Sequence, residues 1–193
     1  MITTHLPAIY LASDSPRRQE LLAQIGVEFT VLSHRVDESR LANEPAEKLV
    51  ERLAIAKAQD ALRRVVDQTP RPVLGADTVV VINEEILGKP ENQEDALRML
   101  ALLSGKTHQV LTALAMVDRH RVEVRLNTNW VTFDEISPEE SLDYWHTGEP
   151  ADKAGAYGVQ GMAGIFIKHI VGSFTGVMGL PLYETYQLLS LFV

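Results

Sequence analysis

The chain has 193 residues, of which 46% are hydrophobic and 23% charged, the proportions of a globular protein with a sizeable buried core. Its formal net charge of -8 argues against a surface that coats nucleic acid, so we expect no nucleic-acid partner. No stretch approaches the roughly 18 apolar residues of a membrane span, and the first residues lack the basic region of a signal peptide. We therefore expect a cytoplasmic protein with no membrane partner. The absence of cysteine excludes disulfides, thiolate metal sites and cysteine nucleophiles.

Strand and helix patterns alternate along the chain. The expected strands are 8–13, 28–33, 72–82, a short partner strand within 83–90, 108–118, 121–127, 129–136 and 165–172. The expected helices are 16–25, 44–66, 92–103, 138–146 and 181–192. Gly26 and Gly105 mark two helix ends, and Asn92 with Asp95 forms an expected N-cap pair. Ser137 opens a capping box with proline at the first helical position. The central strands follow one another too closely for βαβ units throughout. We therefore predict one α/β domain over residues 1–193, with a mixed central sheet flanked by helices.

The start of the first helix carries an unusual pair of charges. Ser15 is placed as the N-cap and Pro16 as the first helical residue, so Arg17 and Arg18 follow at the next two positions. The helix dipole disfavours positive charge there, unless an anion lies between the arginines and the unpaired backbone N–H groups. A phosphate would accept hydrogen bonds from Ser13, Ser15 and both guanidinium groups. The alternative is that the arginines pair with surface carboxylates such as Glu20 and the serines only cap the helix.

Two further stretches suggest a site. Asp77 interrupts a strand that is otherwise apolar, and a buried aspartate is costly unless it is paired or bound to a metal. Its alternative is a bend at a strand end after Gly75. In "PADKAGAYGVQGMAG", Lys153 and Gln160 lie among glycines, which let a backbone approach a ligand closely. The alternative for this stretch is a plain flexible loop.

Several common motifs are absent from the sequence. "GKP" at 88–90 lacks the upstream glycine and the following Ser or Thr of a P-loop. No G-x-S-x-G motif is present to anchor a serine hydrolase triad. The histidines show neither HxxxH nor HExxH spacing, which argues against a histidine-based metal site.

Taken together, these segments resemble the Maf family of nucleotide pyrophosphatases over nearly the whole chain. The opening "LASDSPRRQELL" is similar to the family's S-x-S-P-R-R-x-E-L-L pattern. "GADTVV", "GKP", "LSGKTHQVLTAL", "DKAGAYGVQG" and "GSFTGVMGLPLYET" follow in the family's order and spacing. The sequence departs from the family pattern at Asp14, where glycine or alanine is common, and at Gly88, where glutamate is often found.

The resemblance implies a fold, a reaction and a set of site residues. The fold would be an elongated mixed α/β structure, related to inosine triphosphatases, with a cleft between two lobes. The reaction would be hydrolysis of a nucleoside triphosphate to the monophosphate and pyrophosphate with a divalent cation, Mg²⁺ or Mn²⁺. Asp77 takes the place of the proton acceptor and a metal ligand, and Glu38 is a second carboxylate for the cation. The substrate-binding positions would be Ser13, Arg17, Arg18, Lys57, Thr78, Lys89, Lys153 and Gln160, and the position of Ser15 at the start of the first helix adds that residue.

The pair "GADT" and "GVQG" resembles the branch of the family that acts on dTTP and UTP, and modified pyrimidine nucleotides such as 5-methyl-UTP are further expected substrates. Three alternatives stay open. The chain could belong to the branch that acts on 7-methyl-GTP, it could act mainly on modified nucleotides, or it could be a nucleotide-binding regulator of septum formation. The family analogy also suggests a homodimer.

Overall fold

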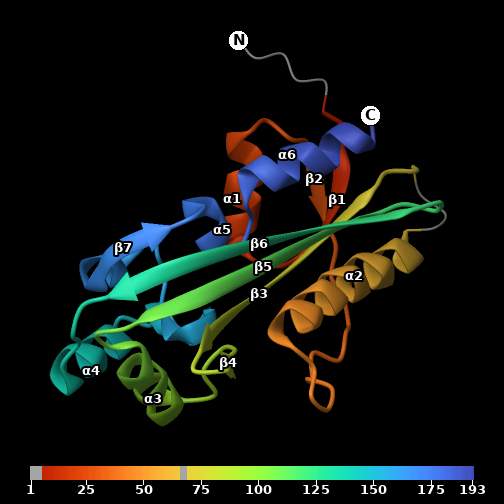
Figure 1. Ribbon diagram of the computed structural model, residues 1–193. Coiled ribbons are helices and arrows are strands. Elements are labelled where there is room, and N and C mark those ends of the chain that lie inside the picture. The colour runs from red at the N-terminus through yellow and green to blue at the C-terminus, as the bar shows by residue number, and fades with distance from the viewer. Residues whose placement is uncertain (1–5, 66–68) are drawn as a thin grey trace. The chain divides into compact units, whose positions relative to one another are not determined.

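In the computed structural model, which describes residues 6–65 and 69–193, seven strands of the described chain form one mixed sheet (Figure 1). The strand order is β2-β1-β3-β5-β6-β7, and β4 pairs with β3. β1 is parallel to β2 and β3, whereas β4 is antiparallel to β3 and β7 is antiparallel to β6. The predicted mixed α/β class is therefore confirmed. The strands are β1 (Ile9–Ala12), β2 (Phe29–Val31), β3 (Val73–Ile82), β4 (Glu85–Leu87), β5 (Thr107–Val117), β6 (Val122–Phe133) and β7 (Ile167–Val171).

Local sequence signals mark several of the helix ends. Ser137 Oγ accepts a hydrogen bond from the Glu140 backbone N–H, and the Glu140 carboxylate accepts one from the Ser137 N–H, which completes the capping box. Asn92 Oδ1 accepts from the Asp95 N–H at 3.0 Å. Gly26 and Gly105 follow two helices with positive φ, as expected. The helices are α1 (Pro16–Gln24), α2 (Ala46–Arg64), α3 (Gln93–Leu103), α4 (Pro138–His146), α5 (Phe174–Val177) and α6 (Leu182–Leu191), with 3₁₀ turns η1 (Glu149–Asp152), η2 (Ala154–Ala156) and η3 (Met162–Phe166).

Two predictions about these elements differ from the structure, and one helix was not predicted. The two strands expected at 121–127 and 129–136 are one continuous strand, β6, so that prediction was wrong. The reason is tertiary, because the buried Asn129 amide donates to the Val110 carbonyl oxygen at 3.3 Å and its oxygen accepts from the Ser173 N–H at 2.6 Å. The helix expected from residue 44 begins at Ala46, and its expected end at Val66 lies outside the described residues. The short helix α5 was not expected.

The chain divides into two compact units, each with its own hydrophobic core. Unit 1 comprises Met1–Asp77, Thr112–Asn127 and Gly179–Val193, and unit 2 comprises Thr78–Leu111 and Thr128–Met178. In unit 1, apolar residues of β1, α2 and β3 pack together; in unit 2, α3 and α4 pack with the glycine-rich segment that contains Tyr157. β3, β5 and β6 each contribute residues to both units. A single domain with a cleft stays a prediction.

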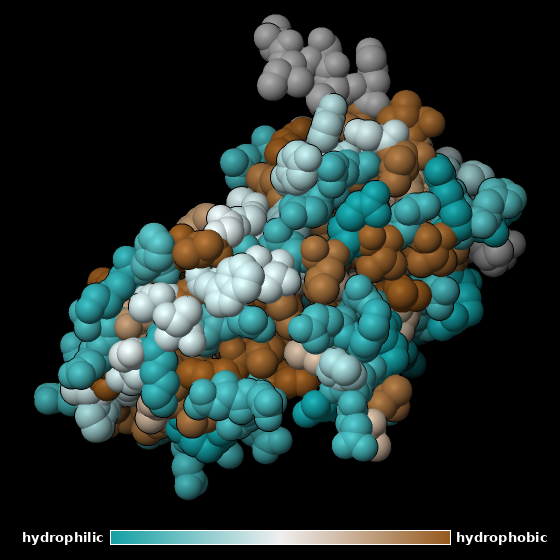
Figure 2. Space-filling model, viewed as in Figure 1, coloured by the Kyte–Doolittle hydropathy of each residue, from teal (hydrophilic) through white to brown (hydrophobic). Residues whose placement is uncertain are grey.

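The visible face of the molecule carries both hydrophilic and hydrophobic residues (Figure 2). Figure 2 shows hydrophilic side chains over much of the visible face, with apolar patches between them. Among the described residues, no helix combines the length and the apolar character required to cross a membrane.

Candidate active site

The loop between β1 and α1 forms the first part of the candidate site. α1 begins at Pro16 with Ser15 as the N-cap, as the sequence predicts. The Ser15 side chain makes no capping hydrogen bond; instead, the Ser15 backbone N–H donates to Ser13 Oγ at 3.3 Å. Ser13 is buried, whereas Ser15 and Arg17 are half-buried. The Ser15 hydroxyl is thus not used to cap the helix that begins beside it.

Arg18 braces the backbone around Asp77. Its Nε donates to the Gly179 carbonyl oxygen at 2.8 Å, and its Nη1 donates to the Ala76 carbonyl oxygen at 3.0 Å and to Ser13 Oγ at 3.1 Å. Burial lowers the pKa of Arg18 below its ordinary value, while the Asp77 charge opposes that shift. Arginine nevertheless stays protonated in proteins. Arg18 therefore places a permanent positive charge beside Asp77 and fixes the residue that precedes it.

Asp77, Lys57 and Glu38 form a chain of alternating charge. The Lys57 ammonium donates to Asp77 Oδ1 at 2.7 Å and lies 2.9 Å from Glu38 Oε1. Asp77 and Lys57 are buried, with 7% and 6% of their surfaces exposed, whereas Glu38 is exposed. Burial raises the pKa of Asp77, and the charges of Lys57 and Arg18 oppose the rise. A buried carboxylate with a raised pKa is suited to accept a proton.

A glycine allows α2 and β3 to approach closely enough for this contact. A Cβ atom at Gly75 would lie 2.3 Å from the Ala54 carbonyl oxygen and 2.9 Å from the Ala58 backbone nitrogen. Only glycine fits at that position without moving the backbone of the helix. Because Lys57 on α2 adjoins Ala58 and Asp77 on β3 follows two residues after Gly75, the same close approach brings the two charged groups together.

His34 is a neighbour of this site that sequence reasoning missed. Burial lowers its pKa first, and the Lys57 charge lowers it further, while Glu38 and Asp14 oppose the shift. The pKa of the His34 imidazole therefore responds to the charges of the candidate site. The sequence offers no spacing motif around His34, so no local signal could have identified it.

The remaining predicted residues belong to unit 2. Thr78 follows Asp77 on β3 and is half-buried, and Lys89 is exposed just after β4. The Lys153 ammonium donates to the Glu149 carbonyl oxygen at 2.6 Å and to Asp152 Oδ1 at 2.7 Å, and thus ties its own loop together. Gln160 is exposed. Unit 1 holds the other predicted residues, namely Ser13, Ser15, Arg17, Arg18, Glu38, Lys57 and Asp77.

Asp77 and Glu38 offer carboxylate oxygens, the type of ligand that Mg²⁺ and Mn²⁺ take. No group of three or more His, Asp or Glu side chains arranged for a metal occurs in the described part of the chain. Asp77 and Glu38 nevertheless each contact the Lys57 ammonium through one carboxylate oxygen, so the two carboxylates lie close to one another. Mg²⁺ is commonly bound by one or two carboxylates together with substrate phosphates, and these two residues match that pattern.

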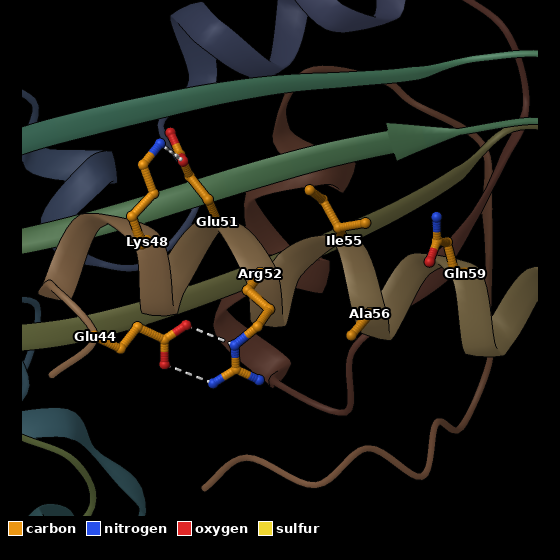
Figure 3. A pocket seen from close by; sticks show the side chains of 7 residues that line it. All are labelled: Glu44, Lys48, Glu51, Arg52, Ile55, Ala56 and Gln59. Carbon is orange, nitrogen blue, oxygen red and sulfur yellow. Dashed lines mark hydrogen bonds and ion pairs between the residues drawn. The ribbon is translucent and has the colours of Figure 1, made fainter. Parts of the chain in front are cut away.

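A groove on the surface of α2 lies apart from these residues. Within it, Arg52 donates to both Glu44 carboxylate oxygens, at 2.6 and 2.8 Å (Figure 3). These hydrogen bonds lower the pKa of Glu44 to about 2. No predicted site residue lines the groove, so it is a surface feature rather than the candidate site. The lining residues are Glu44, Lys48, Glu51, Arg52, Ile55, Ala56 and Gln59.

The chain is similar in sequence to a known protein family and to several named proteins. The family model described as "Maf-like protein" matches residues 8–192. A "dTTP/UTP pyrophosphatase" of Saccharophagus degradans is 51% identical over 95% of this chain and 88% of its own length. Proteins of the same name from Pseudoalteromonas translucida and Escherichia coli strain UTI89 are 53% and 49% identical, over 96% and 97% of this chain and 97% and 94% of theirs. Among solved structures, the Staphylococcus aureus Ham1 protein aligns over 68% of this chain and 72% of its own at 16% identity and a TM-score of 0.44, too low a similarity to support an argument.

Proposed function

Because this chain belongs to the Maf-like protein family, we propose that it hydrolyses dTTP and UTP to the monophosphate and pyrophosphate. The observation that carries this proposal is the buried Asp77 carboxylate, held at 2.7 Å from Lys57 in a chain about half identical to proteins named for that activity. A site that only bound nucleotides would not need a buried carboxylate with a raised pKa.

In the proposed mechanism, Asp77 accepts a proton from the attacking water. The water oxygen bonds to the α-phosphorus, the bond from that phosphorus to the bridging oxygen breaks, and pyrophosphate leaves with that oxygen. Lys57 and Arg18 hold Asp77 in place and, with Arg17, supply positive charge toward the phosphates. When bound by Asp77 and Glu38, Mg²⁺ or Mn²⁺ would neutralise part of the phosphate charge.

We also propose that Thr78 and Gln160 select the base, with Lys89 and Lys153 at the same substrate. A hydroxyl and a neutral amide offer both donors and acceptors, a pattern that suits the edge of thymine or uracil. Modified pyrimidine nucleotides such as 5-methyl-UTP fit the same groups. These roles are supported by the resemblance of "GADT" and "GVQG" to one branch of the family.

The test is pyrophosphate release by the purified protein with Mg²⁺ or Mn²⁺ across dTTP, UTP, CTP, GTP and 7-methyl-GTP. Fast release confined to dTTP and UTP is the expected result. Release from 7-methyl-GTP instead would keep the reaction and overturn the base selection. No release from any of these nucleotides would overturn the proposed reaction and favour a nucleotide-binding regulator.

We further propose a cytoplasmic location, because nucleoside triphosphates are abundant there, and a homodimer, by analogy with the family. The net charge of -8 supports the absence of a nucleic-acid partner. Light scattering of the purified protein would measure its mass, and a monomer at all concentrations would overturn the dimer.

A further inference from the structure

Glu149 begins η1 in unit 2, and its carboxylate lies against the glycine-rich segment and accepts hydrogen bonds from two other parts of the chain. Tyr144 Oη donates to Glu149 Oε1 at 2.7 Å, and the Met162 backbone N–H donates to Oε2 at 2.9 Å. Burial alone would raise the pKa of Glu149, but hydrogen bonds from Tyr144 and from the Met162 and Ala163 backbones lower it below its ordinary value. The ionised carboxylate therefore binds both the preceding helix α4 and the start of η3.

The neighbouring glycines make room for this carboxylate. A Cβ atom at Gly161 would lie 2.2 Å from Glu149 Oε2, and one at Gly158 would lie 3.0 Å from Oε1. Gly161 has φ of -110°, which other residues also adopt, so the requirement for glycine there is one of space. Gly161 thus leaves the space that the Glu149 carboxylate fills, and Gly158 leaves space for that carboxylate and for the Lys153 side chain.

Residues 158–161 form a tight turn, which Tyr144 contacts at its start and Glu149 contacts just after its end. The Gly161 N–H donates to the Gly158 carbonyl oxygen at 3.0 Å and closes the turn around Val159 and Gln160. The Gly158 N–H donates to Tyr144 Oη at 3.0 Å. Val159 is buried, with 7% of its surface exposed, whereas Gln160 is exposed. The turn is therefore held in place by its hydrogen bonds and by the buried Val159, and the Gln160 side chain is exposed to solvent.

We infer that Glu149 is a positioning residue for base selection, because it fixes the turn that presents Gln160. This inference rests on the proposed function, in which Gln160 selects the pyrimidine. A side-chain amide discriminates between bases only when its oxygen and nitrogen are held in a fixed direction, and hydrogen-bonded neighbours supply that restraint. Tyr144 acts with Glu149, because its hydroxyl contacts both the carboxylate and the turn.

The first experiment measures kcat and KM for UTP and CTP in Glu149→Ala, with Glu139→Ala as the matched control. Glu139 is an exposed carboxylate in the first turn of α4. For Glu149→Ala we expect KM for UTP to rise about tenfold, the preference for UTP over CTP to fall by a similar factor, and kcat to change little. The control should keep all three values. If Glu149→Ala folds poorly, Tyr144→Phe takes its place in the experiment. This variant removes one oxygen and keeps the ring, and it should shift the same values in the same direction.

The second experiment is a double-mutant cycle between Glu149 and Gly161. Gly161→Ala alone should raise KM for UTP, because its Cβ would displace the carboxylate. In the Glu149→Ala background the carboxylate is gone, so the same substitution should add little. Additive effects, or an equal loss of kcat for every nucleotide at unchanged KM, would overturn the inference. An unchanged preference in variants of an active protein would also overturn it, whereas a wild-type protein inactive on UTP would overturn the proposed function instead.

Discussion

At the scale of single residues, Lys57 connects the two carboxylates that the proposed reaction needs. Its ammonium contacts Asp77 at 2.7 Å and Glu38 at 2.9 Å, and Lys57 is itself buried. A buried aspartate without a cation would be costly, so Lys57 and Arg18 make the position of Asp77 possible. The same two cations limit how far burial raises the pKa of Asp77. The contacts of Lys57 and Arg18 thus both stabilise the buried Asp77 and affect how readily its carboxylate accepts a proton.

The substitution Asp77→Asn tests the role of the carboxylate. The amide oxygen still accepts the Lys57 hydrogen bond, so we expect the fold to persist, but the amide cannot accept a proton. We expect kcat for pyrophosphate release from UTP to fall by about 10²–10⁴-fold. Circular dichroism should show unchanged secondary structure, and Asp118→Asn in the turn between β5 and β6 serves as the control. A variant that keeps half of the wild-type rate would contradict the assignment of Asp77 as the base.

His108 predicts a pH dependence of stability. It is buried against Tyr157, and burial lowers its pKa from 6.5 to about 4. Between these values the unfolded chain binds a proton that the folded chain does not, so the free energy of unfolding should fall as pH falls. The loss attributable to His108 should reach about 3 kcal/mol between pH 7 and pH 4. Urea unfolding of wild type and His108→Gln over this range should show their difference shrinking as the pH is lowered, and a constant difference would contradict the prediction.

At the scale of elements, the spacing between α2 and β3 determines whether the candidate site can form. Gly75 is the point of closest approach, because any Cβ there would meet backbone atoms of the helix. Ala54 and Ala58 present small side chains to the strand and are fully buried. The helix and the strand therefore pack with only small side chains between them at the level of Gly75.

Gly75→Ala should disturb this packing. We expect the free energy of unfolding to fall by about 3 kcal/mol, at the upper end of the cost of overpacking a core. Pyrophosphate release should fall as well, because displacement of α2 separates Lys57 from Asp77. Gly88→Ala is the matched control for stability, since a Cβ there meets nothing within 4 Å. Equal stability of both variants, measured by denaturant unfolding, would contradict this account.

The elements also show what sequence could and could not predict. Caps at Asn92 and Ser137 were predictable because each involves contacts within three residues. The continuity of β6 was not, because the partners of Asn129 lie 19 and 44 residues away. Arg18 was singled out by its local pattern, but its contact with Gly179, 161 residues distant, is visible only in the folded chain. Patterns located the candidate residues, whereas tertiary contacts determine what each one holds.

At the scale of the whole molecule, neither compact unit is a continuous stretch of chain. The chain passes between units within β3, β5 and β6 and again between Met178 and Gly179. The Gly179 carbonyl oxygen, which begins the last segment of unit 1, binds Arg18 in the first. Unit 1 therefore depends on residues from both ends of the described chain.

This interleaving predicts that the two units unfold together. Both tryptophans, Trp130 and Trp145, belong to unit 2, so fluorescence reports on that unit alone, whereas far-ultraviolet circular dichroism reports on both. Because three strands are shared, we expect the two signals to give the same midpoint in urea. Separate midpoints would contradict cooperative unfolding.

The glycines at 75 and 161 differ in what a mutagenesis library could recover from them. The atoms that exclude a side chain at Gly75 include the Ala54 carbonyl oxygen and the Ala58 backbone nitrogen, which every substitution of those residues retains. The atoms closest to a Cβ at Gly161 all belong to the Glu149 side chain, which substitution removes. A library that randomises each glycine together with its neighbours should therefore return only glycine at 75, but alanine or serine at 161 whenever position 149 becomes small. Position 75 therefore accepts only glycine, whereas position 161 accepts another small residue only together with a substitution at position 149.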